Sequence, residues 1–127
     1  MFTPSMKIYY VKDRYLRDFA MGTKFLKKYP DECEASFYDV DKCKYHSLVN
    51  ILPYDNEKNS IENMNRAYRD MQAEKWSPEG EAREILDRIG DVHHTSMSVG
   101  DMIVMGKNHF IVENFGFYHL ESDMELK

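Results

Sequence analysis

Apolar residues follow two different spacings along the chain, which predicts a mixture of strands and helices. Residues 7–11 (KIYYV) and 46–52 (HSLVNIL) are short apolar runs with β-branched residues, typical of strands. Residues 35–40 (ASFYDV) predict a further strand on the same grounds. Residues 13–29 carry apolar side chains three or four positions apart with basic side chains between them, which indicates an amphipathic helix.

The middle of the chain predicts two more helices. Asn59 or Ser60 can cap the first, whose apolar positions share one face: Ile61, Met64, Ala67, Tyr68 and Met71. The second is expected to begin at Ser77, which would act as the cap with Pro78 in the first helical position. Gly90 suits the left-handed conformation that ends such a helix.

The last third of the chain changes to strand-like spacing. Residues 102–105 and 109–113 flank a Gly-Lys-Asn turn, which predicts a hairpin, and a further extended segment follows it. We therefore expect an α+β fold: a single compact domain with a small, mostly antiparallel sheet, two to three helices and a C-terminal β-hairpin. Its sections would be a strand and helix section at 6–52, a helical section at 59–90 and a hairpin section at 95–121.

The length of the chain, its uncharged runs and its cysteines indicate which class of protein to expect. A chain of 127 residues is the size of one ordinary domain. Its longest uncharged run, residues 45–54, is far shorter than the roughly 20 residues that span a bilayer, and its start lacks a signal-peptide pattern, so neither a membrane protein nor secretion is expected. Cys33 and Cys43 lack metal-site spacing and are most simply two thiols in a reducing cytosol.

The net charge of −5 is unevenly distributed. Residues 1–58 carry ten Lys or Arg against nine Asp or Glu, whereas residues 59–127 carry seven against thirteen, giving +1 and −6. Binding to phosphate backbones normally requires an excess of Lys and Arg. A general affinity for nucleic acid is therefore disfavoured, although the basic stretch 14–28 could contact RNA as well as form a solvated helix face.

The stretch from residue 76 to residue 101 is the most specific part of the sequence. It reads WSPEGEAR, then a short helical run, then HHTSMSVGD. This resembles small phage-encoded proteins of unassigned activity that share a WSPxGxAR…HTSMSVGD signature followed by a hairpin and a GF or GW pair, here Gly116-Phe117. The end of the signature is more distantly similar to the YodL-like domain of bacteria, phages and mobile elements. The resemblance implies a phage origin and no particular reaction.

The hydroxyl groups of the signature have two possible roles. If residues 95–99 are extended, Ser96 and Ser98 lie on one face, and Thr95 lies on the other with its apolar neighbours. The hydroxyls would then either cap the turn at residues 100–101 or line a shallow polar groove that receives a ligand or a partner loop. Asp101 is most simply a turn residue, because a catalytic carboxylate needs a partner acid or His that the sequence does not reveal.

The imidazoles and the Trp76–Arg83 pair also admit structural and functional interpretations. His93 and His94 point to opposite faces of an extended chain, so no metal site and no cofactor are expected. Trp76 would pack against the following helix, and Arg83 would form an ion pair or face a ligand. The candidate binding residues are Trp76, Arg83, His94, Thr95, Ser96, Ser98 and Asp101.

These observations favour a binding protein over an enzyme. The leading hypothesis is a phage accessory protein in the cytoplasm of the infected bacterium that binds a host or phage protein and modulates or inhibits a host factor. One alternative is a nucleotide- or nucleic-acid-binding protein that uses the Ser/Thr-rich loop and Arg83. The other is a structural or oligomeric phage component, for which a homodimer is possible.

Overall fold

The computed structural model describes residues 4–19 and 44–126. These residues form one antiparallel sheet of six strands in the order β2-β1-β3-β4-β5-β6. The strands are β1 Ser5–Val11, β2 His46–Pro53, β3 Met102–Met105, β4 Asn108–Glu113, β5 Gly116–His119 and β6 Met124–Leu126. The helical elements are η1 Asp13–Tyr15, α1 Leu16–Phe19, α4 Ser60–Asp70, η3 Glu74–Trp76 and α5 Ala82–Ile89. The expected α+β fold with a C-terminal hairpin is confirmed.

Most of the predicted elements occur close to their expected bounds. The strands predicted at 7–11 and 46–52 are β1 and β2, and the predicted hairpin is β3 and β4. The helix predicted at 13–29 begins as η1 and α1, and its remainder lies outside the described residues, as do the strand predicted at 35–40 and both cysteines. Strand β6 was not predicted, because its short Met-Glu-Leu sequence has no strand pattern of its own and is ordered by pairing with β5.

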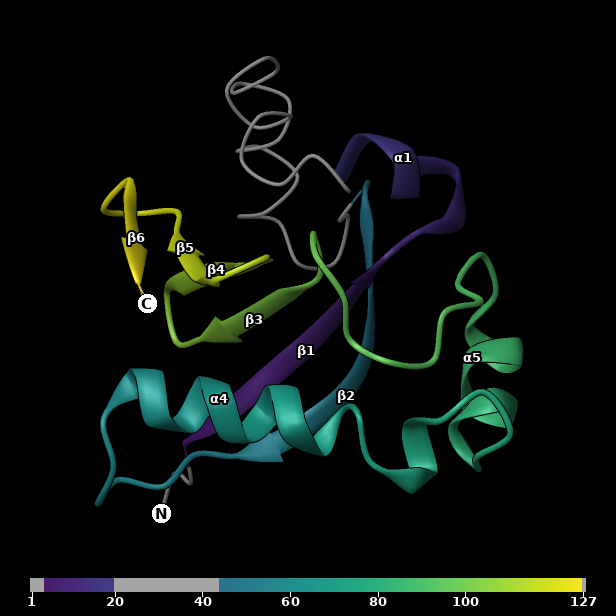
Figure 1. Cartoon of the computed structure of the whole chain (residues 1–127), viewed down its shortest axis with the longest axis horizontal. Coiled ribbons are helices and arrows are strands. Elements are labelled where there is room, and N and C mark those ends of the chain that lie inside the picture. Colours follow the sequence, from purple (N-terminus) through teal and green to yellow (C-terminus); the bar gives the residue numbers. More distant parts are fainter. Residues whose placement is uncertain (1–3, 20–43, 127) are drawn as a thin grey trace.

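Figure 1 shows helix α4 lying over one side of the sheet. Both faces of the sheet carry buried apolar residues. Helix α4 crosses one face of β1 and β2, and its side chains Met64 and Ala67 pack with Ile8 of β1 in the larger core. Trp76 of η3 and Leu86 of α5 complete that core at the side of β2. The opposite face holds a second buried cluster: Tyr9, Val11, Phe19, Tyr45, Met102, Val104, Ile111 and Tyr118.

A β-bulge changes which side chains of β2 face each side of the sheet. Leu48 pairs with Tyr9 and Ile51 pairs with Lys7, so the register shifts by one residue between the two pairs. Directly opposed residues of neighbouring strands point to the same side, and the bulge therefore places both Leu48 and Ile51 on the second face although they are three positions apart.

The two predicted helix starts have different outcomes. Asn59 caps α4 as expected, since its side chain accepts a hydrogen bond from the backbone N–H of Glu62 at 2.8 Å. The prediction that Ser77 caps the next helix is wrong, because α5 begins only at Ala82. Ser77 follows the 3-10 helix η3, and its hydroxyl donates to the carbonyl of Glu74. Gly90 ends α5 with a positive φ of 77°, as predicted, but its ψ of 158° differs from that of the left-handed helical conformation.

Gly80 lies in a close turn of the chain just before α5 begins. A Cβ at this position would lie 2.3 Å from the carbonyl oxygen of Glu74 and 2.4 Å from that of Lys75. The chain therefore turns back closely over η3 before the helix can begin, and only glycine fits at the point of contact. This accounts for the glycine in the WSPxG part of the signature.

Candidate functional site

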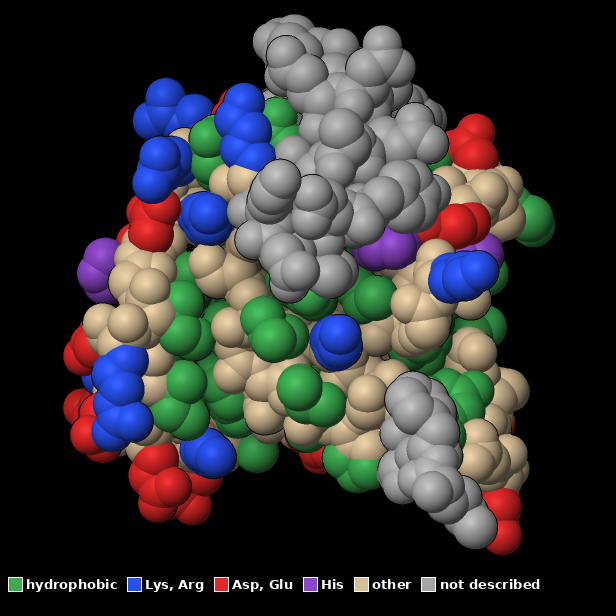
Figure 2. Space-filling model, turned by 180° about the vertical axis from the view of Figure 1, so that it is seen from behind, with side chains coloured by type: hydrophobic (Ala, Val, Ile, Leu, Met, Phe, Trp, Pro, Cys, Tyr) green, Lys and Arg blue, Asp and Glu red, His purple; other side chains and the backbone are tan. Residues whose placement is uncertain are grey.

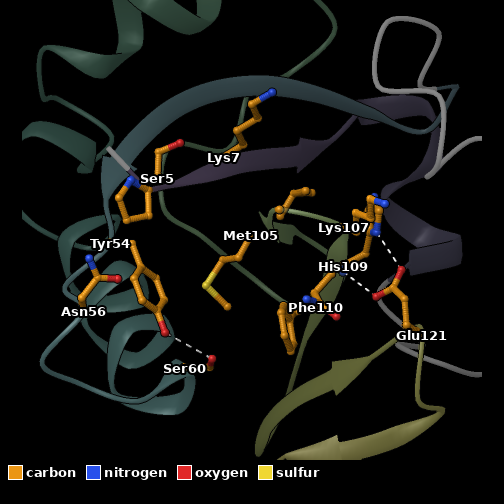
Figure 3. A pocket seen from close by; sticks show the side chains of 14 residues that line it. Ser5, Lys7, Tyr54, Asn56, Ser60, Met105, Lys107, His109, Phe110 and Glu121 are labelled. Carbon is orange, nitrogen blue, oxygen red and sulfur yellow. Dashed lines mark hydrogen bonds and ion pairs between the residues drawn. The ribbon is translucent and has the colours of Figure 1, made fainter. Parts of the chain in front are cut away.

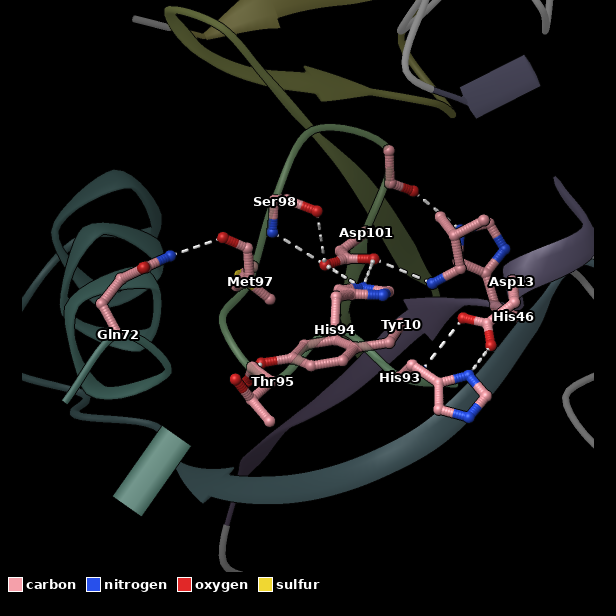
Figure 4. Close-up of polar contacts among 12 residues, drawn as sticks. Tyr10, Asp13, His46, Gln72, His93, His94, Thr95, Met97, Ser98 and Asp101 are labelled. Carbon is pink, nitrogen blue, oxygen red and sulfur yellow. Dashed lines mark hydrogen bonds and ion pairs between the residues drawn. The ribbon is translucent and has the colours of Figure 1, made fainter. Parts of the chain in front are cut away.

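The second part of the signature, residues 93–101, is called the signature bend below. It has no regular secondary structure, yet it is tied to elements on several sides (Figure 4). Tyr10 of β1 donates its hydroxyl to the carbonyl of Thr95 at 2.8 Å. The backbone N–H of Met97 donates to Met71, and the hydroxyl of Ser96 donates to Trp76 at 3.0 Å. The signature bend is thus anchored to β1, to the end of α4 and to η3.

The end of the signature bend is held from the opposite direction. The N–H of Gly100 donates to the carbonyl of Val112 in β4 at 2.9 Å. Nε2 of His46, the first residue of β2, lies 2.8 Å from the carbonyl oxygen of Gly100. Burial lowers the pKa of His46 to about 4, although the hydrogen bond to Gly100 acts in the opposite direction. His46 is therefore neutral at pH 7 and donates from Nε2.

Asp101 is the centre of this arrangement. Its side chain is completely buried, and its two oxygens accept hydrogen bonds from the backbone N–H groups of Val11 and Ser98, each at 2.8 Å. Nε2 of His94 lies 3.1 Å from both oxygens. Burial raises the pKa of the Asp101 carboxyl, and the facing His94 and the N–H donors oppose that rise. The carboxylate thereby joins the end of β1 to both ends of its own loop.

His94 is fixed by stacking as well as by Asp101. Its ring lies 4.7 Å from the ring of Tyr10 at an interplanar angle of 18°. The other ring nitrogen, Nδ1, is buried and has no hydrogen-bond partner among the described residues. A His–Asp pair can serve in general acid–base catalysis only if the imidazole reaches a substrate. Here one nitrogen faces the carboxylate and the other is shielded from solvent, so the described geometry is that of a structural pair.

The start of the signature bend is tied to η1. The Asp13 carboxylate accepts a hydrogen bond from the backbone N–H of His93 at 3.0 Å and contacts Nδ1 of the same residue. Arg14 makes two hydrogen bonds to the Asp91 carboxylate, at 3.0 and 2.7 Å. These residues are about 80 positions apart in the sequence, so no local pattern could have indicated their pairing.

The structure places three predicted binding residues in the interior. Trp76, Thr95 and Asp101 are 3%, 4% and 0% exposed, so their side chains cannot form a docking surface. Trp76 packs in the larger core, with its ring 5.9 Å from that of Tyr10. The prediction that all seven residues form one binding surface is therefore wrong. Of the other four residues, Arg83, His94 and Ser96 are half-buried and Ser98 is exposed. Thr95 and Met97 are buried and Ser98 is exposed, as expected for an extended segment, but Ser96 and Val99 are both half-buried, so the expected alternation does not extend to Val99.

Arg83 lies apart from the signature bend in acidic surroundings. It lines a shallow hollow of about 370 Å³ together with Glu79, Glu81, Glu84 and Asp87, and no residue of the bend lines that hollow. Within the described part of the chain, no carboxylate lies within ion-pair distance of the Arg83 guanidinium. The four carboxylates would repel a phosphate, which weighs against Arg83 as an anion-binding residue.

The residues that sequence reasoning missed are Tyr10, Asp13 and His46. Each contributes a contact to the signature bend from a distant strand or turn. The only signal in the sequence was the polar or amphipathic character of these residues within or beside apolar strands.

No family model, curated protein or solved structure matches this chain. The resemblance to phage proteins therefore rests on the signature residues alone. Among the described helices, none combines the length and apolar character needed to cross a membrane. The described His, Asp and Glu side chains do not form groups of three or more that could hold a metal ion.

Proposed function

We propose that this protein acts by binding another protein, as a phage accessory factor in the cytoplasm of the infected bacterium that modulates or inhibits a host factor. The phage context comes from the signature. The polar side chains at the centre of the signature make internal contacts, so they do not supply a binding surface. Support for a binding role comes instead from another part of the protein surface.

One observation carries the binding proposal: two apolar side chains of β2 are exposed on the second face of the sheet. Leu48 is 42% and Ile51 is 53% exposed, and the bulge places them on the same side. Figure 2 shows this face, where hydrophobic side chains gather over the sheet. Exposed apolar groups that lie together are typical of interaction sites.

The surroundings of these side chains indicate the chemistry of the partner. Lys7 pairs with Ile51 and lies beside it on the same face. Covering the exposed parts of Leu48 and Ile51 would contribute about 2 kcal/mol, enough for an anchor but not for a whole interface. The surface therefore fits a protein that presents apolar side chains with a carboxylate placed to pair with Lys7.

A double variant tests this proposal. Leu48→Thr/Ile51→Thr removes apolar area and places a β-branched residue, which suits a strand, at both positions. Tagged wild-type protein is used to isolate the partner from infected cells, and the purified partner is then titrated against each variant. We expect the double variant to bind at least about tenfold more weakly, corresponding to about 1.4 kcal/mol. The control Phe115→Thr removes an apolar side chain that is 84% exposed in the turn between β4 and β5, and this variant should bind normally.

Equal binding by the double variant and the wild type would overturn the proposed surface. A second copy of the chain could cover the same surface in place of a host protein, and light scattering distinguishes these two cases. A wild-type dimer that becomes a monomer in the double variant would replace the host-factor proposal with the oligomeric component.

The nucleotide alternative requires a phosphate at Arg83, and a nucleotide-dependent rise in melting temperature that Arg83→Gln abolishes would favour it.

A further inference from the structure

A separate hollow of about 880 Å³ opens at the end of the sheet where β1 and β3 part. The pairing of these strands reaches only from Tyr9↔Met102 to Lys7↔Val104, although β1 continues back to Ser5 and β3 continues to Met105. Ser5 and Met105 both line the hollow. Its size is within the range of pockets that hold small ligands.

The wall of the hollow is mainly apolar and aromatic. Tyr54, Met105 and Phe110 come from the β2–α4 connection, β3 and β4, and Figure 3 shows the Met105 thioether directed between the two rings. Phe110 is fixed in place, because its ring stacks on His119 with 4.7 Å between ring centroids. The Tyr54 hydroxyl lies 3.4 Å from that of Ser60, the first residue of α4. Such a wall favours a flat aromatic group.

The charged groups at the hollow favour an anion. Lys7 and Lys107 line it, and no described carboxylate lies within ion-pair distance of either ammonium group. The carboxylate that also lines it, Glu121, accepts hydrogen bonds from the backbone N–H and Nδ1 of His109 at 2.6 and 2.8 Å. In a protein with a net charge of −5, this end of the sheet therefore presents two available cations.

We infer that this hollow binds a small molecule with a flat aromatic body and a single carboxylate or phosphate group. The aromatic body lies against Tyr54, Met105 and Phe110, and the anionic group lies at the rim near Lys7 and Lys107, away from the rings (Figure 3). The proposed protein surface also uses Lys7, but the purified chain alone should bind such a compound, so this inference can fail or hold without the protein partner.

Binding is tested with naphthoate, naphthyl phosphate and the uncharged naphthol as probes. The readout is the NMR signal of methionine methyl groups, which a bound ring shifts strongly. The Met105 methyl resonance is assigned with the variant Met105→Leu, and we expect its chemical shift to change in a saturable manner with naphthoate or naphthyl phosphate. The chemical shifts of the buried Met64 and Met97 methyls should stay unchanged, which would show that the fold is intact. Whichever anion binds more tightly identifies the carboxylate or the phosphate as the natural group.

Charge variants decide between specific and incidental binding. Lys7→Gln/Lys107→Gln should weaken binding of the better anion about five- to tenfold, whereas the equally charged control Arg69→Gln/Lys75→Gln should leave it unchanged. Both control side chains are exposed and do not line the hollow. An unmoved Met105 methyl at millimolar probe, equal affinity for naphthol, or equal weakening by both variants would each overturn the inference.

Discussion

The carboxylate of Asp101 and the imidazole of His94 face each other in the interior, with Nε2 3.1 Å from both carboxylate oxygens. A buried carboxylate is costly to remove from water unless hydrogen-bond donors surround it. Here the donors come from Val11 and Ser98 as well as from His94. The pair therefore stabilises the fold: loss of Asp101 leaves the buried N–H donors without an acceptor, and loss of His94 leaves the carboxylate with the two backbone donors alone.

This relationship predicts energetic coupling between the two residues. His94→Phe keeps the stacking on Tyr10 but removes the nitrogen that faces Asp101, and it should lower the free energy of unfolding by about 2–4 kcal/mol. Asp101→Asn should lower it by a similar amount, because an amide cannot accept from every donor around it. Urea unfolding of both single variants and the double variant measures the coupling. The double variant should lose clearly less than the sum, and strictly additive losses would contradict the pairing.

Gly100 should tolerate no side chain. Its φ is +96°, and a Cβ there would lie 2.6 Å from the Cβ of Phe19 and 2.8 Å from the Phe19 carbonyl oxygen. Gly100→Ala should therefore cost about 3 kcal/mol or more in thermal or urea unfolding. Gly106→Ala is the matched control, since Gly106 also has positive φ but nothing lies within 4 Å of its Cβ position. The control should cost only about 1 kcal/mol, and similar losses at both sites would refute the close approach to Phe19.

His46 should make stability depend on pH. Burial lowers its folded-state pKa to about 4, below its ordinary value of 6.5. The unfolded chain then binds a proton that the folded chain excludes, so stability from this group is complete above pH 6.5 and is lost as pH falls toward 4. The loss is about 3 kcal/mol at most.

The non-titrating variant His46→Gln isolates this contribution. Its amide can still donate to Gly100, so the fold is kept. Urea unfolding at pH 7 and pH 5 should show a larger loss for the wild type than for the variant. An identical pH dependence in the two proteins would show that His46 stays protonated or accessible in the folded state.

The two predicted helix caps should behave differently. Asn59→Ala removes the acceptor for the N–H of Glu62 and should cost about 1 kcal/mol. Ser77→Ala removes only a hydroxyl that donates to Glu74 at the surface, and its cost should stay below about 0.5 kcal/mol. Thermal unfolding of the two variants checks this, and a larger loss for Ser77→Ala would restore Ser77 as a cap.

The residue pattern within a short stretch of sequence was enough to predict the elements that contacts between near neighbours determine. Strands β1 and β2, the cap at Asn59, the end of α5 at Gly90 and the β3–β4 hairpin all carry their own signals. Where the prediction failed, a contact with a neighbouring segment of the chain prevailed over the cap signal. Ser77 and Pro78 form a convincing helix start, but the approach of Gly80 to η3 delays α5 to Ala82.

The signature predicted where the candidate site lies in the sequence, but it did not predict the structural role of these residues. Polar residues such as Asp101 and Thr95 are more often exposed than buried, so a surface role was the natural expectation. Their partners lie in β1, and the sequence offers no local sign of such contacts. The β-bulge that exposes Leu48 and Ile51 on one side is likewise a property of strand pairing and cannot be read from either strand alone.

Amide hydrogen exchange tests most directly whether the signature bend is an internal junction of the fold. The N–H groups of Val11 and Ser98 both donate to the buried Asp101 carboxylate, so they should exchange only when the whole domain unfolds. We predict that the opening free energy at both amides equals the global free energy of unfolding to within about 1 kcal/mol. If the Ser98 amide instead exchanges by a local opening several kcal/mol below the global value, the signature bend is a mobile loop and the account is contradicted.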